Sequence, residues 1–173
     1  LALCTDNLST PEIKLPGENF NTVLYTGDAA TTQAVTGVGF QPEFLWLKSR
    51  SASTGNIIQD VARGATTRLE TNSNGVQVTD ATYVASFDSD GFTVGNNTDV
   101  NANTATYVTR NWKAGGAPTA DNSAGVGATP TAGSVKINGA NLGSALAGSI
   151  AATRISANTT SGFSIVAYTG NYA

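Results

Sequence analysis

The stretch VTGVGFQPEFLWLKSR, residues Val35–Arg50, decides the fold of this chain. It reads as a tight Gly-rich turn, an entry marked by Pro42 and then a strand. In a strand, side chains alternate between the two faces. Phe44, Trp46 and Lys48 therefore point one way, and Leu45 and Leu47 point the other. The alternation predicts a sheet with a buried side, and the rest of the chain is organised around that sheet.

The composition narrows the class of protein. Charged residues make up 12% of the 173 residues, against a typical value of about 25%. Thr, Ser, Asn, Gly and Ala take their place, which is typical of extracellular or virion proteins with exposed strands. The net charge is −3 and no basic block occurs, so we expect no nucleic-acid binding. No apolar run is long enough to predict membrane insertion.

The absence of certain residue types excludes several chemistries. The chain has no His, which excludes imidazole general-base catalysis and most zinc sites. The single cysteine, Cys4, cannot form an internal disulfide, and we expect it to be an idle thiol. The chain begins with Leu1 and contains no Met, so we expect a processed chain or a segment of a longer one.

The chain divides into four parts by composition. Residues 1–19 predict an extended linker from a preceding domain, and residues 20–113 predict the sandwich core. Residues 114–133 are rich in Gly, Ala and Thr and form either a long loop or an arm that reaches a neighbouring subunit, with the arm favoured. Residues 134–173 are either the closing strands of the sandwich or the start of a second copy of the module, because the segment Ile165–Gly170 resembles Thr22–Gly27.

The fold predicted from this pattern is all-β. About ten short strands are separated by Gly, Asn and Asp turns, and no long helical period occurs. We expect an antiparallel β-sandwich of the jelly-roll, concanavalin-like kind. Its core should rest on aromatic residues, and the candidates are Phe20, Tyr25, Phe40, Phe44, Trp46, Phe87, Phe92, Trp112 and Phe163. The strand Ala105–Lys113 has no purely apolar face, so either of its faces could meet the core.

Three short motifs are better explained by turns than by ligand sites. Gly37 and Gly39 predict a turn with positive φ, because no helix follows them to complete a phosphate site. Asp60 and Arg63 predict a local ion pair. The loop that contains Asp88 and Asp90 has carboxylates spaced for a cation such as calcium, but it lacks the further oxygen ligands of a calcium loop. A hairpin turn at Asp90-Gly91 is favoured over a cation site.

Several stretches together resemble a family of phage structural modules that is found in tail-fibre-like and other virion proteins, chiefly of marine and cyanobacterial phages. They are NTVLYTG (21–27), VTGVGFQPEFLWLKSR (35–50), DVARGA (60–65), SFDSDGFTVG (86–95), NWKAGG (111–116) and SGFSIVAYTGN (161–171). The lead-in Ala2–Ile13 resembles the linker that follows a lectin-like domain in longer members. The family often carries His after the loop matching 51–55 and Trp where Arg110 stands, and this chain departs from it at both places.

The resemblance implies a non-enzymatic structural component of the virion surface, a tail-fibre or capsid-surface module used in assembly and host attachment. Its expected partners are other virion proteins and copies of itself, as a homo-oligomer with a trimer favoured. No cofactor and no metal site is expected.

Two other functions compete with this one. A glycan-binding module would need an exposed aromatic ring beside polar side chains, and the residues that fit are Trp112, Asn111, Tyr107 and Tyr83. A glycan-cleaving enzyme, the remote alternative, would need two carboxylates across a cleft. The candidate carboxylates are Asp60, Glu70, Asp88, Asp90 and Asp99.

Overall fold

A computed structural model describes residue 13 and residues 15–171 of the chain. Its elements are almost all strands, and the prediction of an all-β fold with antiparallel sheets is confirmed. A 3₁₀ turn at Pro16–Glu18 and one short helix, α1 (Thr98–Asn101), are the helical elements of the described part. Cys4 and most of the linker expected at 1–19 lie outside the described residues.

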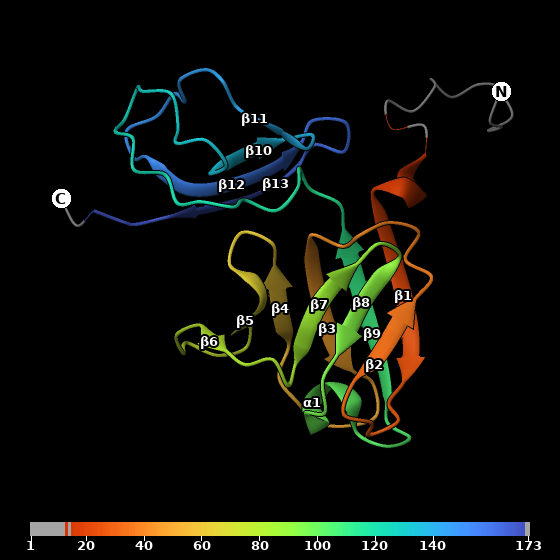
Figure 1. The fold of residues 1–173 in the computed structure, drawn as a ribbon. Coiled ribbons are helices and arrows are strands. Elements are labelled where there is room, and N and C mark those ends of the chain that lie inside the picture. Colours follow the sequence, from red (N-terminus) through yellow and green to blue (C-terminus); the bar gives the residue numbers. More distant parts are fainter. Residues whose placement is uncertain (1–12, 14, 172–173) are drawn as a thin grey trace, which may run out of the picture.

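The largest sheet has six antiparallel strands in the order β1-β9-β3-β4-β5-β6 (Figure 1). Their bounds are β1 (Phe20–Thr26), β9 (Thr106–Trp112), β3 (Phe44–Ser49), β4 (Ile57–Asp60), β5 (Gly64–Glu70) and β6 (Val78–Thr79). The stretch Val35–Arg50 provides β3, at the centre of this sheet between β9 and β4.

A second sheet of three strands packs against the first. It has the order β2-β8-β7, with β2 (Gln33–Thr36), β8 (Gly91–Val94) and β7 (Val84–Asp88). Residues of both sheets meet in one buried cluster, so the two sheets form the layers of a sandwich.

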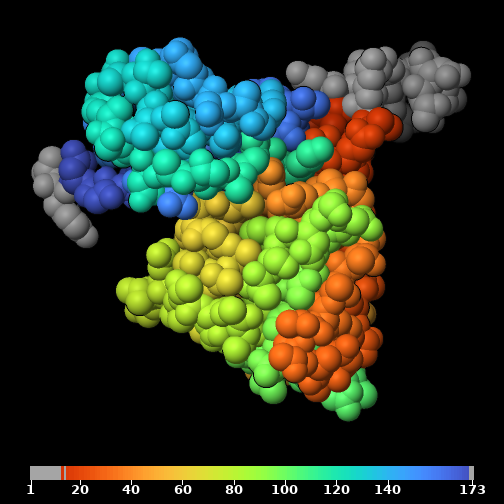
Figure 2. Space-filling model, in the orientation of Figure 1, coloured from red at the N-terminus to blue at the C-terminus, as the bar shows by residue number. Residues whose placement is uncertain are grey.

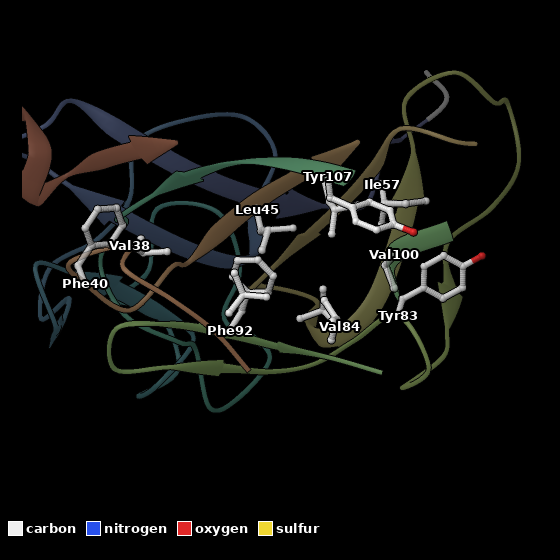
Figure 3. Close-up of a cluster of buried hydrophobic side chains, with 12 residues drawn as sticks. Val38, Phe40, Leu45, Ile57, Tyr83, Val84, Phe92, Val100 and Tyr107 are labelled. Carbon is white, nitrogen blue, oxygen red and sulfur yellow. The ribbon is translucent and has the colours of Figure 1, made fainter. Parts of the chain in front are cut away.

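The core lies between these two layers (Figure 3). Leu45 and Leu47 of β3 are fully buried there, whereas Phe44, Trp46 and Lys48 face the other way, as the alternation predicted. Tyr107 of β9 is also buried and stacks on Tyr25, with 4.9 Å between ring centroids. The inward face of β9 is therefore the one that carries Tyr107.

The aromatic residues expected in a single core divide into two groups. Phe40 and Phe92 are buried between the layers, and Tyr25 and Phe87 pack against them. Four others cluster on the opposite side of the six-stranded sheet, with ring centroids 4.8–5.8 Å apart, and they are Phe20, Phe44, Trp112 and Phe163. Trp46 is on that outer side too, with the Arg110 guanidinium 5.5 Å from its ring centroid.

Strands beyond residue 134 form a third sheet in the order β11-β10-β12-β13. Its strands are β10 (Val135–Ile137), β11 (Ala140–Asn141), β12 (Ala152–Asn158) and β13 (Phe163–Tyr168), and β10 and β12 are parallel. The similar segments in β1 and β13 do not pair, because β1 pairs with β9 and β13 with β12. The third sheet lies over one end of the sandwich (Figures 1 and 2).

The Gly/Ala/Thr-rich segment 114–133 makes its contacts with its own chain. The Thr119 N–H donates to the Gly133 carbonyl, and the Asn122 N–H donates to the Thr153 carbonyl, each at 2.9 Å. The Asn122 side chain also donates to the Ala152 carbonyl. Within the chain, this segment therefore lies as a loop on the third sheet.

Candidate functional site

A polar pocket of about 490 Å³ opens where the sandwich meets the third sheet. That volume falls in the range of small-molecule sites, which is about 300–1,000 Å³. We call it the junction pocket. Its lining residues come from five separate segments and are Glu18, Asn19, Glu43, Lys113, Ala114, Gly115, Gly116, Asn138, Gly139, Asn158 and Thr160.

Glu43 is the buried acid of the junction pocket. It stands directly before β3, where its N–H donates to the Trp112 carbonyl and its carbonyl accepts from the Val61 N–H, both at 2.9 Å. These two bonds fix the backbone on both sides of the residue. Its side chain is therefore held at the end of the sheet, with the residue only 8% exposed.

Glycines form one wall of the pocket because the chain passes very close to β12 there. A Cβ added to Gly115 would lie 2.1 Å from the Ala157 carbonyl oxygen, so no other residue fits without a shift of the backbone. The Gly115 N–H donates to the Ser156 hydroxyl at 2.9 Å, and its carbonyl accepts from the Gly139 N–H at 2.7 Å. The wall is therefore bare backbone held in place by the third sheet.

Asparagines hold other parts of the pocket lining together. The buried Asn158 side chain donates to the Asn19 side-chain oxygen at 3.0 Å and accepts from the Thr160 N–H at 2.9 Å. The Asn138 amide donates to the Thr159 hydroxyl at 2.7 Å. These bonds connect the segment before β1 to the third sheet, so the pocket has a fixed shape.

The surroundings of Glu43 shift the pKa of its carboxyl group in both directions. Burial is the largest and raises its pKa above the ordinary value, while the backbone N–H groups of Gly116 and Ala114 and the charge of Lys113 lower it. Its Oε2 atom is buried and has no hydrogen-bond partner among the described residues. Buried polar atoms are nearly always paired, so this oxygen is an acceptor that a ligand or a water molecule would satisfy.

The four residues predicted to contact a glycan do not form one surface. Tyr107 and Asn111 lie in the interior on the inward face of β9, and the Asn111 amide donates to the Asn21 carbonyl. Tyr83 is buried as well, with its hydroxyl on Asp99 and the Arg68 guanidinium 4.2 Å from its ring centroid. Trp112 is on the outer side, inside the aromatic cluster.

The carboxylates considered for a cation site are occupied by the chain itself. Asp88 accepts from the hydroxyls of Ser86 and Thr93 at 2.8 and 2.7 Å. Asp90 accepts from the N–H groups of Gly37 and Gly39 at 3.2 and 2.6 Å. Both glycines have positive φ, 88° and 87°, which confirms the turn predicted for them. Among the described residues, no group of three or more potential metal ligands comes together.

The other carboxylates considered for glycan cleavage also have structural partners. Asp60 pairs with Arg63 at 2.6 Å, which confirms the predicted ion pair, and both side chains are largely buried. Glu70 pairs with Arg68, and Asp99 accepts from the Tyr83 hydroxyl at 3.1 Å. These acids stabilise turns and strand edges, and they do not converge on the junction pocket.

Sequence reasoning missed Glu43 and the glycine wall. The available signal was an acidic residue between Pro42 and the apolar run of β3, a place where a charged side chain is hard to keep solvated. The second signal was the pair Gly115-Gly116 directly after β9. Neither signal shows which other segments complete the pocket, because these lie far away in the chain.

The geometry defines a β-sandwich module with an appended sheet and a polar pocket between them. The chain belongs to the family described as a domain of unknown function (DUF7483), which matches residues 15–140. That match covers the sandwich and continues into β10 and the start of β11. Comparisons with curated proteins and with solved structures found no match. None of the described helices is long and apolar enough to cross a membrane.

Proposed function

We propose that this chain is a non-enzymatic structural module of a phage virion, in a tail fibre or on the capsid surface, used in assembly and in attachment to the host. The phage context comes from the sequence resemblance. The structure supports a module that assembles, because it leaves an apolar surface uncovered at one edge of the third sheet.

That uncovered surface is the observation that carries the proposal. Val166 and Tyr168 of β13 are 51% and 63% exposed. They border a groove of about 340 Å³ between β13 and the strands β4 and β5, which Ile58, Leu69 and Ile165 also line. Apolar side chains gathered around a groove are typical of an interaction site. We call Val166, Tyr168 and this groove the β13 surface.

A second copy of this chain is the occupant that the β13 surface fits best. β13 is the last strand of its sheet, so one of its edges has no strand of the described residues beside it. Soluble proteins usually blunt such an edge with a charged residue or a proline, and Phe163–Tyr168 contains neither. An apolar segment of one copy set against the groove of the next gives a closed ring when the rotation between copies closes, and a trimer is the form we favour.

Sedimentation velocity on the purified chain tests this assembly. We expect a trimer for the wild type and a monomer for the double variant Val166→Ser/Tyr168→Ser, because the substitutions remove the apolar contact. Val126→Ser is the matched control, since Val126 is 56% exposed but lies outside the β13 surface. The control should sediment like the wild type. A wild-type chain that stays monomeric at high concentration would contradict the proposal.

The finer fold that we propose is the jelly-roll, concanavalin-like form of the sandwich. The nested pairing supports it: β1 pairs with β9 and β2 pairs with β8, so the first strands of the sandwich lie beside the last ones. Such nesting is what results when a long antiparallel hairpin is rolled into two layers.

Glycan binding is the second candidate function, and the junction pocket favours it. The pocket has the size of a small-ligand site and a lining rich in side-chain amides, and one buried acceptor in it has no partner. Glycan cleavage has less support, because the described carboxylates considered for it have structural partners elsewhere.

A further inference from the structure

The unpartnered side-chain oxygen of Glu43 indicates that the junction pocket is a ligand site. Glu43 is more than nine-tenths buried and lines the pocket, and its Oε2 atom accepts no hydrogen bond from the described residues. A chain selected only for stability would place an apolar residue here, since a buried acceptor without a donor is costly. A ligand that supplies the missing donor is one physical reason for such a group.

We propose that the junction pocket binds a neutral sugar residue, and that Glu43 Oε2 accepts a hydrogen bond from one of its hydroxyl groups. The inference rests on the proposed attachment function and names the class of ligand for it. A sugar ring offers several hydroxyl groups, each of which can both donate and accept. It therefore matches a lining that mixes the acceptor of Glu43 with amide groups.

The charges of the lining favour a neutral ligand over an anion. Two carboxyl groups, Glu18 and Glu43, face the pocket, and only Lys113 offsets them. An anionic ligand would meet a like charge next to the buried acid. Apolar ligands are disfavoured for a different reason, because the pocket is lined by side-chain amides, charged groups and backbone, and Ala114 is its only aliphatic side chain.

The shape of the pocket suits a compact ring. Gly115, Gly116 and Gly139 present backbone without side chains on one wall, so a ligand can approach closely. Asn138 lies between β10 and β11, and Thr160 lies between β12 and β13 of the third sheet, while Glu43 stands directly before β3 of the sandwich. A bound sugar would therefore contact both parts of the molecule and hold them together.

An NMR titration tests the proposal. Neutral hexoses, pentoses and N-acetylhexosamines are each added to the isotope-labelled chain at millimolar concentration. We expect saturable shifts of the backbone amides of Ala114, Gly115, Gly116 and Asn158 with at least one sugar. Glu43→Gln removes the charged acceptor but keeps the shape, and it should weaken binding about tenfold or more.

Two controls make the result decisive. Asp121→Asn removes one negative charge from an exposed position outside the pocket and should bind like the wild type. The amide spectrum of each variant shows directly whether it is folded. Absence of saturable shifts with every sugar, or equal affinity of wild type and Glu43→Gln, would overturn the sugar site. Sedimentation of the same samples reports assembly independently, so a trimer without sugar binding would leave the proposed assembly intact.

Discussion

Polar side chains at inward positions of the central strands are held by hydrogen bonds within the core. The Asn111 amide donates to the Thr109 hydroxyl at 3.1 Å, and both residues are fully buried on β9. Gln59 of β4 is buried too, and its amide donates to the Ala65 carbonyl. The amide N–H groups therefore find partners inside, whereas the side-chain oxygens of Asn111 and Gln59 have none among the described residues, so the mixed face of β9 is only partly satisfied.

At the residue scale, Glu43 should make stability depend on pH. Its pKa is raised in the folded chain, chiefly by burial, so the folded state binds its proton more tightly than the unfolded state does. The tighter proton binding stabilises the folded state. This contribution is fully present below the ordinary pKa of Glu, and it is lost as the pH rises through the raised pKa of Glu43 in the folded chain. Lys113 and Glu18 also line the pocket.

Thermal unfolding of wild type and Glu43→Gln across acidic to neutral pH measures this effect. We expect the wild type to lose stability relative to the variant as pH rises, because the variant cannot ionise at this position. All other titrating groups are the same in the two proteins and cancel in the difference. A difference in melting temperature that does not change with pH would show that Glu43 titrates normally.

At the element scale, the end of the β7–β8 hairpin is fitted tightly against β2. A Cβ added to Gly91 would lie 1.9 Å from the Val35 carbonyl oxygen. Directly before it, Asp90 accepts from the amides of Gly37 and Gly39, which lie just after β2. The glycine is thus required by close approach of another strand, whereas a hairpin turn alone had been predicted to explain it.

Replacing Gly91 by Ala should therefore destabilise the sandwich. The added methyl group forces β8 away from β2, and we expect a loss of about 1–3 kcal/mol or more in the free energy of unfolding. Urea denaturation measures it. Gly143→Ala serves as the control, because nothing lies within 4 Å of its added Cβ, and it should change stability little. Equal stability of the two variants would contradict the close packing.

The sequence predicted the strands better than it predicted which face of each strand packs in the core. Alternation at Phe44–Ser49 identified the buried face of β3 correctly, because that strand has two large aliphatic residues on one side. The same reasoning could not choose a face for β9, where Tyr107, Thr109 and Asn111 all point inward. Hydrogen bonds to partners far away in the chain decide that face, and periodicity does not report them.

At the scale of the whole molecule, an aromatic contact joins the third sheet to the sandwich. Phe163 of β13 stacks on Trp112 and meets Phe44 edge-on, each with 5.8 Å between ring centroids. Arg154 of β12 also donates to the Ala62 carbonyl at 3.1 Å. The junction pocket and the β13 surface both exist only because the sheets meet in this way. Neither site could be predicted from sequence, since each combines segments that are distant in the chain.

The composition of purified particles tests the central claim, that this chain is a component of a virion, most directly. The particles are those of the phage that the proposal predicts to encode the chain, and quantitative mass spectrometry is the measurement. We expect the chain in fixed stoichiometry with the other structural proteins, in a multiple of three copies, and accessible to antibodies on the intact particle. Particles free of the chain, with the chain found only in the lysate of the host, would contradict the account.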